Sequence, residues 1–338
     1  MSKSNRQLRL ASRPVGMCDD TTFELVEEPT PELGDGQALV RLVYLSIDPT
    51  NRVWIREEPS YLPPVEIGAV MRGGGVGTVV ESRNADLPVG TTLTGLLGWQ
   101  EHAVVNPDDF FRVVPAGVPL TAVMNVLGSS GMTAYFGLLD VGRAKEGETV
   151  VVSGAAGSVG SLVGQIAKII GCRVIGIAGT DEKCAWVTED LGFDACINYK
   201  SENVGARLGE FCPAGIDVYF DNVGGSILDA ALQHLALNAR VPLCGAISMY
   251  NSIEQPEPIH SYANLIAARG RIEGFLVFDY FDRYAEAAGR LLEWVADGRL
   301  QAREQIVDGL EHAPRALNML FTGENTGKLL VRVADEPA

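Results

Sequence analysis

Residues 149–171, TVVVSGAAGSVGSLVGQIAKIIG, constrain the fold more than any other part of this chain. The β-branched run up to Ser153 is typical of a buried strand, and the segment after Gly157 has the length of a helix. The spacing Ala155-x-Gly157-x-x-Gly160 lies between them, in the strand, turn and helix order in which glycines bring a pyrophosphate to a helix N-terminus. The alternative is a plain helix that packs on a sheet through small residues.

The same alternation continues along the chain. Strands are expected at 173–179, 195–199, 216–224 and 239–247, and a second helix at 181–192. Strands separated by helices of this length indicate crossover units and a parallel sheet covered on both faces. The first hundred residues instead hold short apolar runs broken by Gly and Pro, which predicts a β-rich domain. A lone strand at 327–335 could rejoin that first domain.

Composition excludes several functions. The net charge of −16 repels phosphate backbones and acidic lipid surfaces, so we expect no nucleic-acid partner and no membrane partner. The six cysteines show no pairing or metal-binding spacing, which favours reduced thiols. The N-terminus lacks the apolar core of a signal peptide, and every long apolar run is interrupted by polar residues or glycine. We therefore expect a cytoplasmic protein.

The end of the second strand indicates which dinucleotide binds. Thr180 is expected to cap the next helix, with Asp181 and Glu182 in its first turn, and Lys183 is then available to a 2′-phosphate. This order favours NADP over NAD, although Asp181 could still serve as a ribose ligand.

Metal and serine-hydrolase chemistry have no support in the sequence. The four histidines are isolated, and the cysteines do not cluster as zinc ligands do. The segment LGSSGMTAY lacks the G-x-S-x-G pattern of a nucleophile elbow. We expect no bound metal.

Taken together, the motifs resemble those of the medium-chain dehydrogenase/reductase superfamily, and within it the zinc-independent leukotriene, prostaglandin and curcumin reductase group. The resemblance is carried nearly end to end by YLSIDPTNR, VMRGGGVGTVVES, LGSSGMTAYFGL, SGAAGSVGSLVGQIAK, AGTDEK, LGFDACINYK, VYFDNVGG, CGAISMYN, EGFLVFDY and GENTGKLLV. It implies an α/β fold: a GroES-like β-rich domain at 1–125 and 302–338, a doubly wound Rossmann domain at 126–301 that binds NADP, and a cleft where they meet. At the two positions where zinc-containing members carry His and Glu, this chain has Gly73 and Gly74.

The resemblance also implies the cofactor contacts. The pyrophosphate is expected on Gly157, Ser158, Val159 and Gly160, the 2′-phosphate on Lys183 and Tyr199, and a ribose near Asn222. The nicotinamide side is expected to be lined by Cys244, Gly245, Ala246, Ile247, Ser248, Tyr250, Phe275, Leu276, Val277 and Asn325, with Thr133 close by. From the residues alone, Tyr199 could equally be a sheet-edge aromatic, and the two asparagines could be turn residues.

The implied activity is NADPH-dependent reduction of the C=C bond of a hydrophobic α,β-unsaturated ketone or aldehyde by a homodimeric enzyme. Charge develops on the carbonyl oxygen, and Tyr250 is the candidate donor there, the alternative being an aromatic lid on the nicotinamide. Many relatives carry Tyr where this chain has Thr50, so the contact could pass to Tyr61, to water or to nothing. Trp54, Met71, Phe278 and Tyr280 are available to form apolar surroundings. A quinone oxidoreductase and a non-catalytic NADPH-binding protein remain as alternatives.

Overall fold

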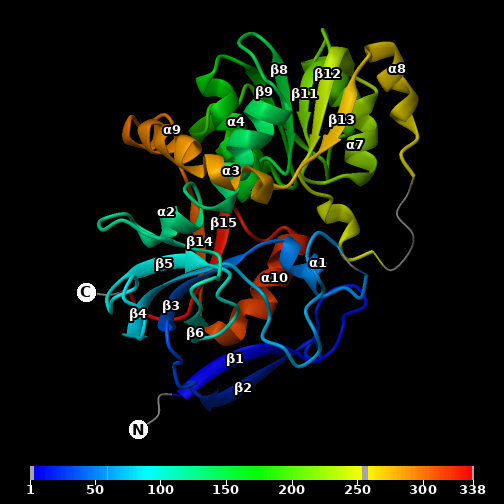
Figure 1. The fold of residues 1–338 in the computed structure, drawn as a ribbon. Coiled ribbons are helices and arrows are strands. Elements are labelled where there is room, and N and C mark those ends of the chain that lie inside the picture. The colour runs from blue at the N-terminus through cyan, green and yellow to red at the C-terminus, as the bar shows by residue number, and fades with distance from the viewer. Residues whose placement is uncertain (1–3, 59, 253–257, 337–338) are drawn as a thin grey trace. The chain divides into compact units, whose positions relative to one another are not determined.

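The computed structural model describes residues 4–58, 60–252 and 258–336. The chain forms two compact units, residues 1–124 with 304–338 and residues 125–303. These limits lie close to the predicted division at 125/126 and 301/302. Figure 1 shows a β-rich unit and a unit whose central sheet is flanked by helices, as the predicted fold class requires.

The unit of residues 125–303 is built on a six-stranded sheet in the order β10-β9-β8-β11-β12-β13, in which every neighbouring pair is parallel. The strands are β8 (Thr149–Ser153), β9 (Arg173–Ala178), β10 (Ala195–Asn198), β11 (Ile216–Phe220), β12 (Leu235–Leu243) and β13 (Arg271–Gly274). The helices are α3 (Ser129–Phe136), α4 (Ser158–Ile169), α5 (Asp181–Ala185), α6 (Val204–Phe211), α7 (Gly225–Leu232), α8 (Asn264–Ala268) and α9 (Tyr284–Ala296). The predicted parallel sheet is confirmed.

Burial explains the sequence pattern of the central strands. Val150, Val151 and Val152 are all completely buried, because α6 and α7 cover one face of the sheet and α4 packs on the other. Helix α5 is shorter than the predicted 181–192, since from Trp186 to Asp190 the chain continues as a π-helical turn. Short 3₁₀ turns follow at Ile247–Met249, Ser261–Ala263 and Val277–Arg283.

The strand order reverses between β8 and β11. The chain runs outward from β8 through β9 to β10, then returns to β11 and continues in the opposite direction to β13. In open parallel sheets, ligands bind outside the carboxyl ends of the strands at this point, because the loops there diverge. The ends of β8 and β11 are therefore where a dinucleotide site is expected.

The other unit is built on a seven-stranded sheet in the order β14-β15-β3-β4-β5-β7, with β6 paired to β3 and a separate β1-β2 pair. The strands are β1 (Ser4–Leu10), β2 (Phe23–Pro29), β3 (Ala38–Ile47), β4 (Gly75–Ser82), β5 (Thr92–Gly95), β6 (His102–Val105), β7 (Phe111–Val113), β14 (Glu304–Asp308) and β15 (Lys328–Arg332). The helices are α1 (Thr50–Trp54), α2 (Leu120–Met124) and α10 (Ala313–Thr322), with a 3₁₀ turn at Leu310–His312.

The C-terminal strand joins this unit, as the sequence predicted. β15 pairs antiparallel with β3, and Leu330 lies opposite Ser46. Leu329, Leu330 and Val331 are buried in its core. Across the described parts of the chain, no helix is long and apolar enough to cross a bilayer.

Candidate active site

The glycine-rich turn follows β8 directly. Gly154 adopts a φ of +61°, a conformation that costs other residues energy because of their Cβ. Helix α4 begins at Ser158 with Gly157 as its N-cap, and no side chain caps this end. A Cβ on Gly160 would lie 2.3 Å from the Gly154 carbonyl oxygen, so only glycine allows α4 to approach the turn this closely. The structure thus places Gly157, Ser158, Val159 and Gly160 together at an uncapped helix N-terminus.

Asp221 ties the two strands together at the reversal point. Its side chain is completely buried and accepts hydrogen bonds from the Ser153 hydroxyl at 2.9 Å, from the Tyr219 hydroxyl at 3.1 Å and from the backbone N–H groups of Val223 and Gly224. Burial raises the pKa of Asp221, although these donors oppose the shift. The sequence analysis did not select Asp221, although a carboxylate directly after a buried strand was a visible signal.

Asn222, which follows β11, is hydrogen-bonded to Ser153 at the end of β8. Its Nδ2 donates to the Ser153 carbonyl at 2.7 Å, and its backbone N–H donates to the Ser153 hydroxyl at 2.8 Å. These bonds fix the side chain at the reversal point, where the sequence analysis expected a ribose contact. They use the amide nitrogen, so the Oδ1 oxygen is the acceptor that this geometry offers to a ligand.

A pocket of about 620 Å³ lies beside this point within residues 125–303. Six of the predicted nicotinamide-side residues line it: Cys244, Gly245, Ala246, Tyr250, Phe275 and Leu276. Ile247, Ser248 and Val277 are their chain neighbours but do not line the pocket. The lining also includes Gly224, Gly225, Leu228, Leu243, Met249, Ile259, Gly274 and Asp279, which the sequence analysis did not select. The wall is largely apolar, as a small-molecule site usually is.

Tyr250 places its phenol on this wall. The phenol oxygen accepts a hydrogen bond from the Ala246 backbone N–H at 3.1 Å. A Cβ on Gly245 would lie 3.5 Å from the same oxygen, so the hydroxyl lies over a residue without a side chain. In this bond the phenol is the acceptor.

Cys244 puts a thiol in the same wall. Removal of the sulfur from water, with a smaller effect from the Asp221 charge, raises the pKa of Cys244 to about 12. Because the thiolate is the nucleophile, this raised pKa makes Cys244 a poor nucleophile at neutral pH.

The helix after β9 begins where the sequence analysis expected it, although it is shorter than predicted. The Thr180 hydroxyl accepts from the Lys183 backbone N–H at 3.2 Å and so caps α5. The Asp181 carboxylate accepts from Asn198 Nδ2 at 2.6 Å, which accounts for one of its oxygens. Burial, with the charge of Lys200, lowers the pKa of the Lys183 ammonium. Two lysine charges therefore lie near each other where an anion was expected.

Tyr199 follows β10 and lies against the same turn. A Cβ on Gly179 would lie 3.1 Å from the Tyr199 hydroxyl and from its ring, so Gly179 leaves room for this aromatic ring. Tyr199 as a whole remains 43% exposed. Tyr199 and Lys183 are thus brought to one end of the sheet.

In the β-rich unit, Thr50 and Tyr61 form a pair. The Tyr61 hydroxyl is hydrogen-bonded to Thr50 Oγ1, and its ring packs edge-on against Trp54 at a centroid distance of 6.4 Å. Burial raises the pKa of the Tyr61 phenol, which therefore keeps its proton at neutral pH. The Arg72 guanidinium lies over the other ring, 5.5 Å from the Trp54 centroid. The structure thus supplies a phenol beside the position where a tyrosine was missing.

Three further residues that the sequence analysis named do not line the 620 Å³ pocket. Asn325 lies between α10 and β15, and its Nδ2 donates to the Gly327 carbonyl at 3.2 Å. Thr133 is half-buried on α3 and does not line the 620 Å³ pocket. Met71 is completely buried in the core of the β-rich unit, which makes it a structural residue.

The Trp99 indole fills the space beside Gly73. A Cβ on Gly73 would lie 2.6 Å from the indole nitrogen, so no larger side chain fits there without movement. Within residues 4–58, 60–252 and 258–336, no three His, Cys, Asp or Glu side chains gather as metal ligands.

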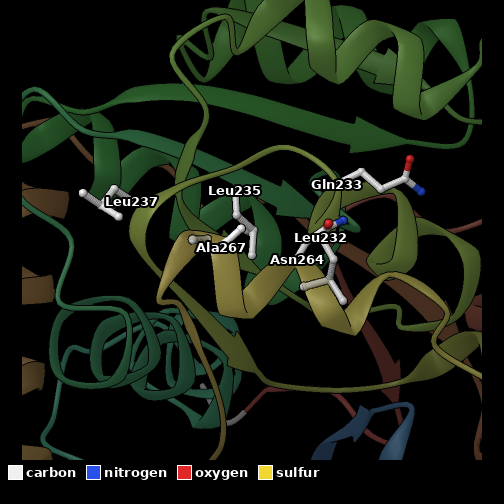
Figure 2. Close-up of a pocket in the computed structure, with 7 residues that line it drawn as sticks. Leu232, Gln233, Leu235, Leu237, Asn264 and Ala267 are labelled. Atoms are coloured by element: carbon white, nitrogen blue, oxygen red, sulfur yellow. The ribbon is translucent and has the colours of Figure 1, made fainter.

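A second pocket of about 280 Å³ lies elsewhere in the Rossmann unit (Figure 2). It is lined by Leu232, Gln233, Leu235, Leu237, Asn264, Ala267 and Ala268, from the end of α7, β12 and α8. None of the predicted site residues lines it, and it has no part in the site described above.

A parallel sheet with a glycine-rich turn at its reversal point, joined to a β-rich unit, is typical of dinucleotide-dependent oxidoreductases. Residues 6–113 match a family described as the N-terminal domain of oxidoreductase, and residues 158–294 match one described as zinc-binding dehydrogenase.

Two curated relatives match along nearly the whole chain. The NADPH-dependent curcumin reductase of Escherichia coli is 44% identical over 338 residues, which covers 98% of each chain. The NADP⁺-dependent 2-alkenal reductase of Nicotiana tabacum is 40% identical over 340 residues, again covering 98% of each. The solved structure of CurA in complex with NADPH from Vibrio vulnificus is 43% identical with a TM-score of 0.93, and covers 98% of this chain and 100% of that one.

The chain therefore belongs to the medium-chain dehydrogenase/reductase superfamily, in the zinc-independent group of curcumin, 2-alkenal and prostaglandin reductases. It is an NADP-dependent oxidoreductase, which resolves in favour of NADP the choice that Asp181 had left open.

Proposed function

We propose that this protein uses NADPH to reduce the C=C bond of α,β-unsaturated ketones and aldehydes. The observation that carries the proposal is the 620 Å³ pocket at the reversal point, which combines an apolar wall with the Tyr250 phenol. The names of the reductases from E. coli and N. tabacum support the same reaction.

The residues present fit NADPH. The glycines leave the N-terminus of α4 accessible to the pyrophosphate, and the helix dipole favours an anion there. Lys183 and Tyr199 supply a charge and a neutral donor for the 2′-phosphate, and Asn222 offers Oδ1 to a ribose hydroxyl. When bound, NADPH supplies the hydride that is added to the β-carbon of the substrate.

Tyr250 is proposed to stabilise the charge that develops on the carbonyl oxygen. A donor aimed at this oxygen is worth about 10²–10³ in rate, because the apolar wall around it weakens competition from water. Its replacement by phenylalanine removes the hydroxyl and keeps the ring, and we expect kcat to fall about 100-fold while the ring continues to line the pocket.

Tyr61 is proposed as the proton donor to the α-carbon, with Thr50 orienting its hydroxyl. The contact between the two hydroxyls supports this role, because it gives Tyr61 a fixed partner. The raised pKa of Tyr61 keeps the phenol protonated at working pH, as a general acid must be. Together the two residues would take the place of the tyrosine that many relatives carry at position 50.

Cys244 is compatible with this chemistry. Enones react with thiolates, so a nucleophilic cysteine in the pocket would be consumed by the substrate. The raised pKa of Cys244 keeps the sulfur as a thiol and so protects it.

The finer parts of the proposal concern substrate, assembly and location. The apolar lining favours a medium-sized or large hydrophobic substrate, and we propose a homodimer in the cytoplasm. Sedimentation at several protein concentrations tests the dimer.

The test is loss of nicotinamide absorbance with NADPH, and separately with NADH, against enones, enals, quinones and saturated ketones, with a chelator present throughout. We expect chelator-resistant oxidation of NADPH by enones, with the saturated carbonyl as product. Faster turnover of quinones would make it a quinone oxidoreductase, and tight NADPH binding without turnover would make it a binding protein. Either result would overturn the proposal.

A further inference from the structure

Lys328 is a buried lysine to which the proposed reaction gives no role. It is the first residue of β15, and only 1% of its side chain is exposed. Its ammonium pairs with Asp48 Oδ1, and Asp48 follows the end of β3. A lysine is almost never fully buried unless it is paired, so this ion pair is a built feature of the fold.

Asp48 is the organising residue of the turn that leads to Thr50. Its Oδ2 accepts from the Ser46 hydroxyl, and its backbone N–H donates to Asn51 Oδ1 at 2.8 Å. Asn51 returns a bond from its own N–H to the Asp48 carbonyl at 2.9 Å, and its Nδ2 donates to the Arg72 carbonyl at 3.1 Å. The turn between β3 and α1 is therefore fixed by the bonds of Asp48 to Ser46 and Lys328 and by those of Asn51 to Asp48 and Arg72.

The same turn carries the Thr50 hydroxyl to Tyr61. Lys328 fixes the carboxylate at the root of the turn, and it lies three residues after Asn325 in the chain. The buried Lys328 ammonium thus connects the turn that carries Thr50 to the start of β15, the strand that follows Asn325.

We propose that Lys328 and Asp48 are a positioning pair, which sets where Thr50 and Tyr61 present their hydroxyl groups to the substrate. The inference rests on the proposed function, because it assigns those hydroxyls to the substrate. Displacement of a reacting group by about 1 Å costs about 10²-fold in rate, and loss of residues that orient catalytic groups commonly costs 10- to 100-fold.

The test is the double variant Asp48→Asn/Lys328→Met, which removes both charges together. Removing only the Asp48 charge would leave Lys328 buried without its partner, and the chain could then fail to fold. Two controls lie on the same strand. Arg332→Gln breaks the exposed pair of Arg332 with Asp308, and Val331→Ala weakens the buried core of β15 without touching the turn.

Three measurements are made on each full-length variant: kcat and KM with an enone, the Kd of NADPH by fluorescence, and hydrogen exchange of residues 46–56. For the double variant we expect kcat to fall about 10- to 100-fold, the Kd of NADPH to stay within about 3-fold, and exchange to quicken in the turn. Both controls should keep kcat within about 2-fold. If the double variant does not fold, Lys328→Met alone is used, because Asp48 is 27% exposed and keeps the Ser46 hydroxyl as a donor, with an expected loss of about 10-fold in kcat.

Unchanged kcat and unchanged exchange in the double variant would overturn the inference, as would an equal loss of kcat in Val331→Ala. If the wild-type protein reduces no enone, the proposed function fails, but hydrogen exchange of the turn still decides whether the ion pair holds it.

Discussion

The close approach of α4 to the glycine-rich turn can be tested with one methyl group. In Gly160→Ala, the added Cβ would lie 2.3 Å from the Gly154 carbonyl oxygen and 2.9 Å from its carbonyl carbon. Both atoms belong to the backbone, so no side chain can rotate away. Ordinary contact begins near 3.4 Å, so the helix must move by about 1 Å.

The expected cost follows from two opposing effects. Overpacking of a close-packed site costs about 1–3 kcal/mol, and a clash with backbone lies at the upper end of this range. Alanine in a helix gains about 1 kcal/mol over glycine. The net loss of about 2 kcal/mol lowers the melting temperature by about 4–8 °C for a unit of this size. Because the displaced N–H groups are those proposed for the pyrophosphate, NADPH should bind at least about 10-fold more weakly.

Gly289→Ala is the matched control. Gly289 is an exposed glycine within α9, and a Cβ there meets nothing within 4 Å. This variant should melt about 1–4 °C higher than the wild type, by helix propensity alone, and bind NADPH normally. Thermal unfolding by circular dichroism and a fluorescence titration with NADPH compare the two variants. If Gly160→Ala melts as high as Gly289→Ala and binds NADPH equally well, the steric reasoning is wrong.

Three other predictions concern single side chains. Lys183→Gln should lower kcat/KM for NADPH about 10- to 100-fold and leave NADH almost unchanged, since a hydrogen bond between charged groups contributes about 1.5–3 kcal/mol; Lys168→Gln, whose ammonium pairs with Asp194, is the control and should show no such change of preference. Tyr61→Phe should lower kcat at least about 100-fold. Because a proton donor works below its pKa and burial raises the pKa of Tyr61, the wild type should keep a constant kcat/KM from neutral pH into the alkaline range; a fall centred near neutral pH would assign the proton to another group. Cys244 should resist iodoacetamide at pH 8 in the native protein and react after unfolding, as mapped by mass spectrometry, and rapid native labelling would contradict its raised pKa.

Local patterns predicted much of the dinucleotide unit. The run of valines before Ser153, the spacing of Gly157 and Gly160, and the Thr180 cap each depend on residues close together in the chain. Such signals survive in the sequence because strand burial, turn geometry and capping are short-range effects. The length of α5 was predicted less well, because a π-helical turn differs little from an α-helix in its apolar spacing.

The sites of contact between distant segments were not predicted. A carboxylate after a buried strand was visible at Asp221, but its bond to Ser153 depends on β11 lying beside β8, and the strand order has no local signal. The sequence offered Tyr61 as one of three ways to replace a missing tyrosine, and only the structure shows its hydroxyl on Thr50.

The sequence by itself thus determined the fold class, the glycine-rich turn, the preference for NADP and the family resemblance, because each depends on the order and spacing of neighbouring residues. Only the tertiary structure decided which polar groups meet. Lys328 and Asp48 are 280 positions apart, and they pair because β15 returns to the edge of β3. Burial then makes Lys328 depend on Asp48, since the lysine charge alone would lie in the core without its partner.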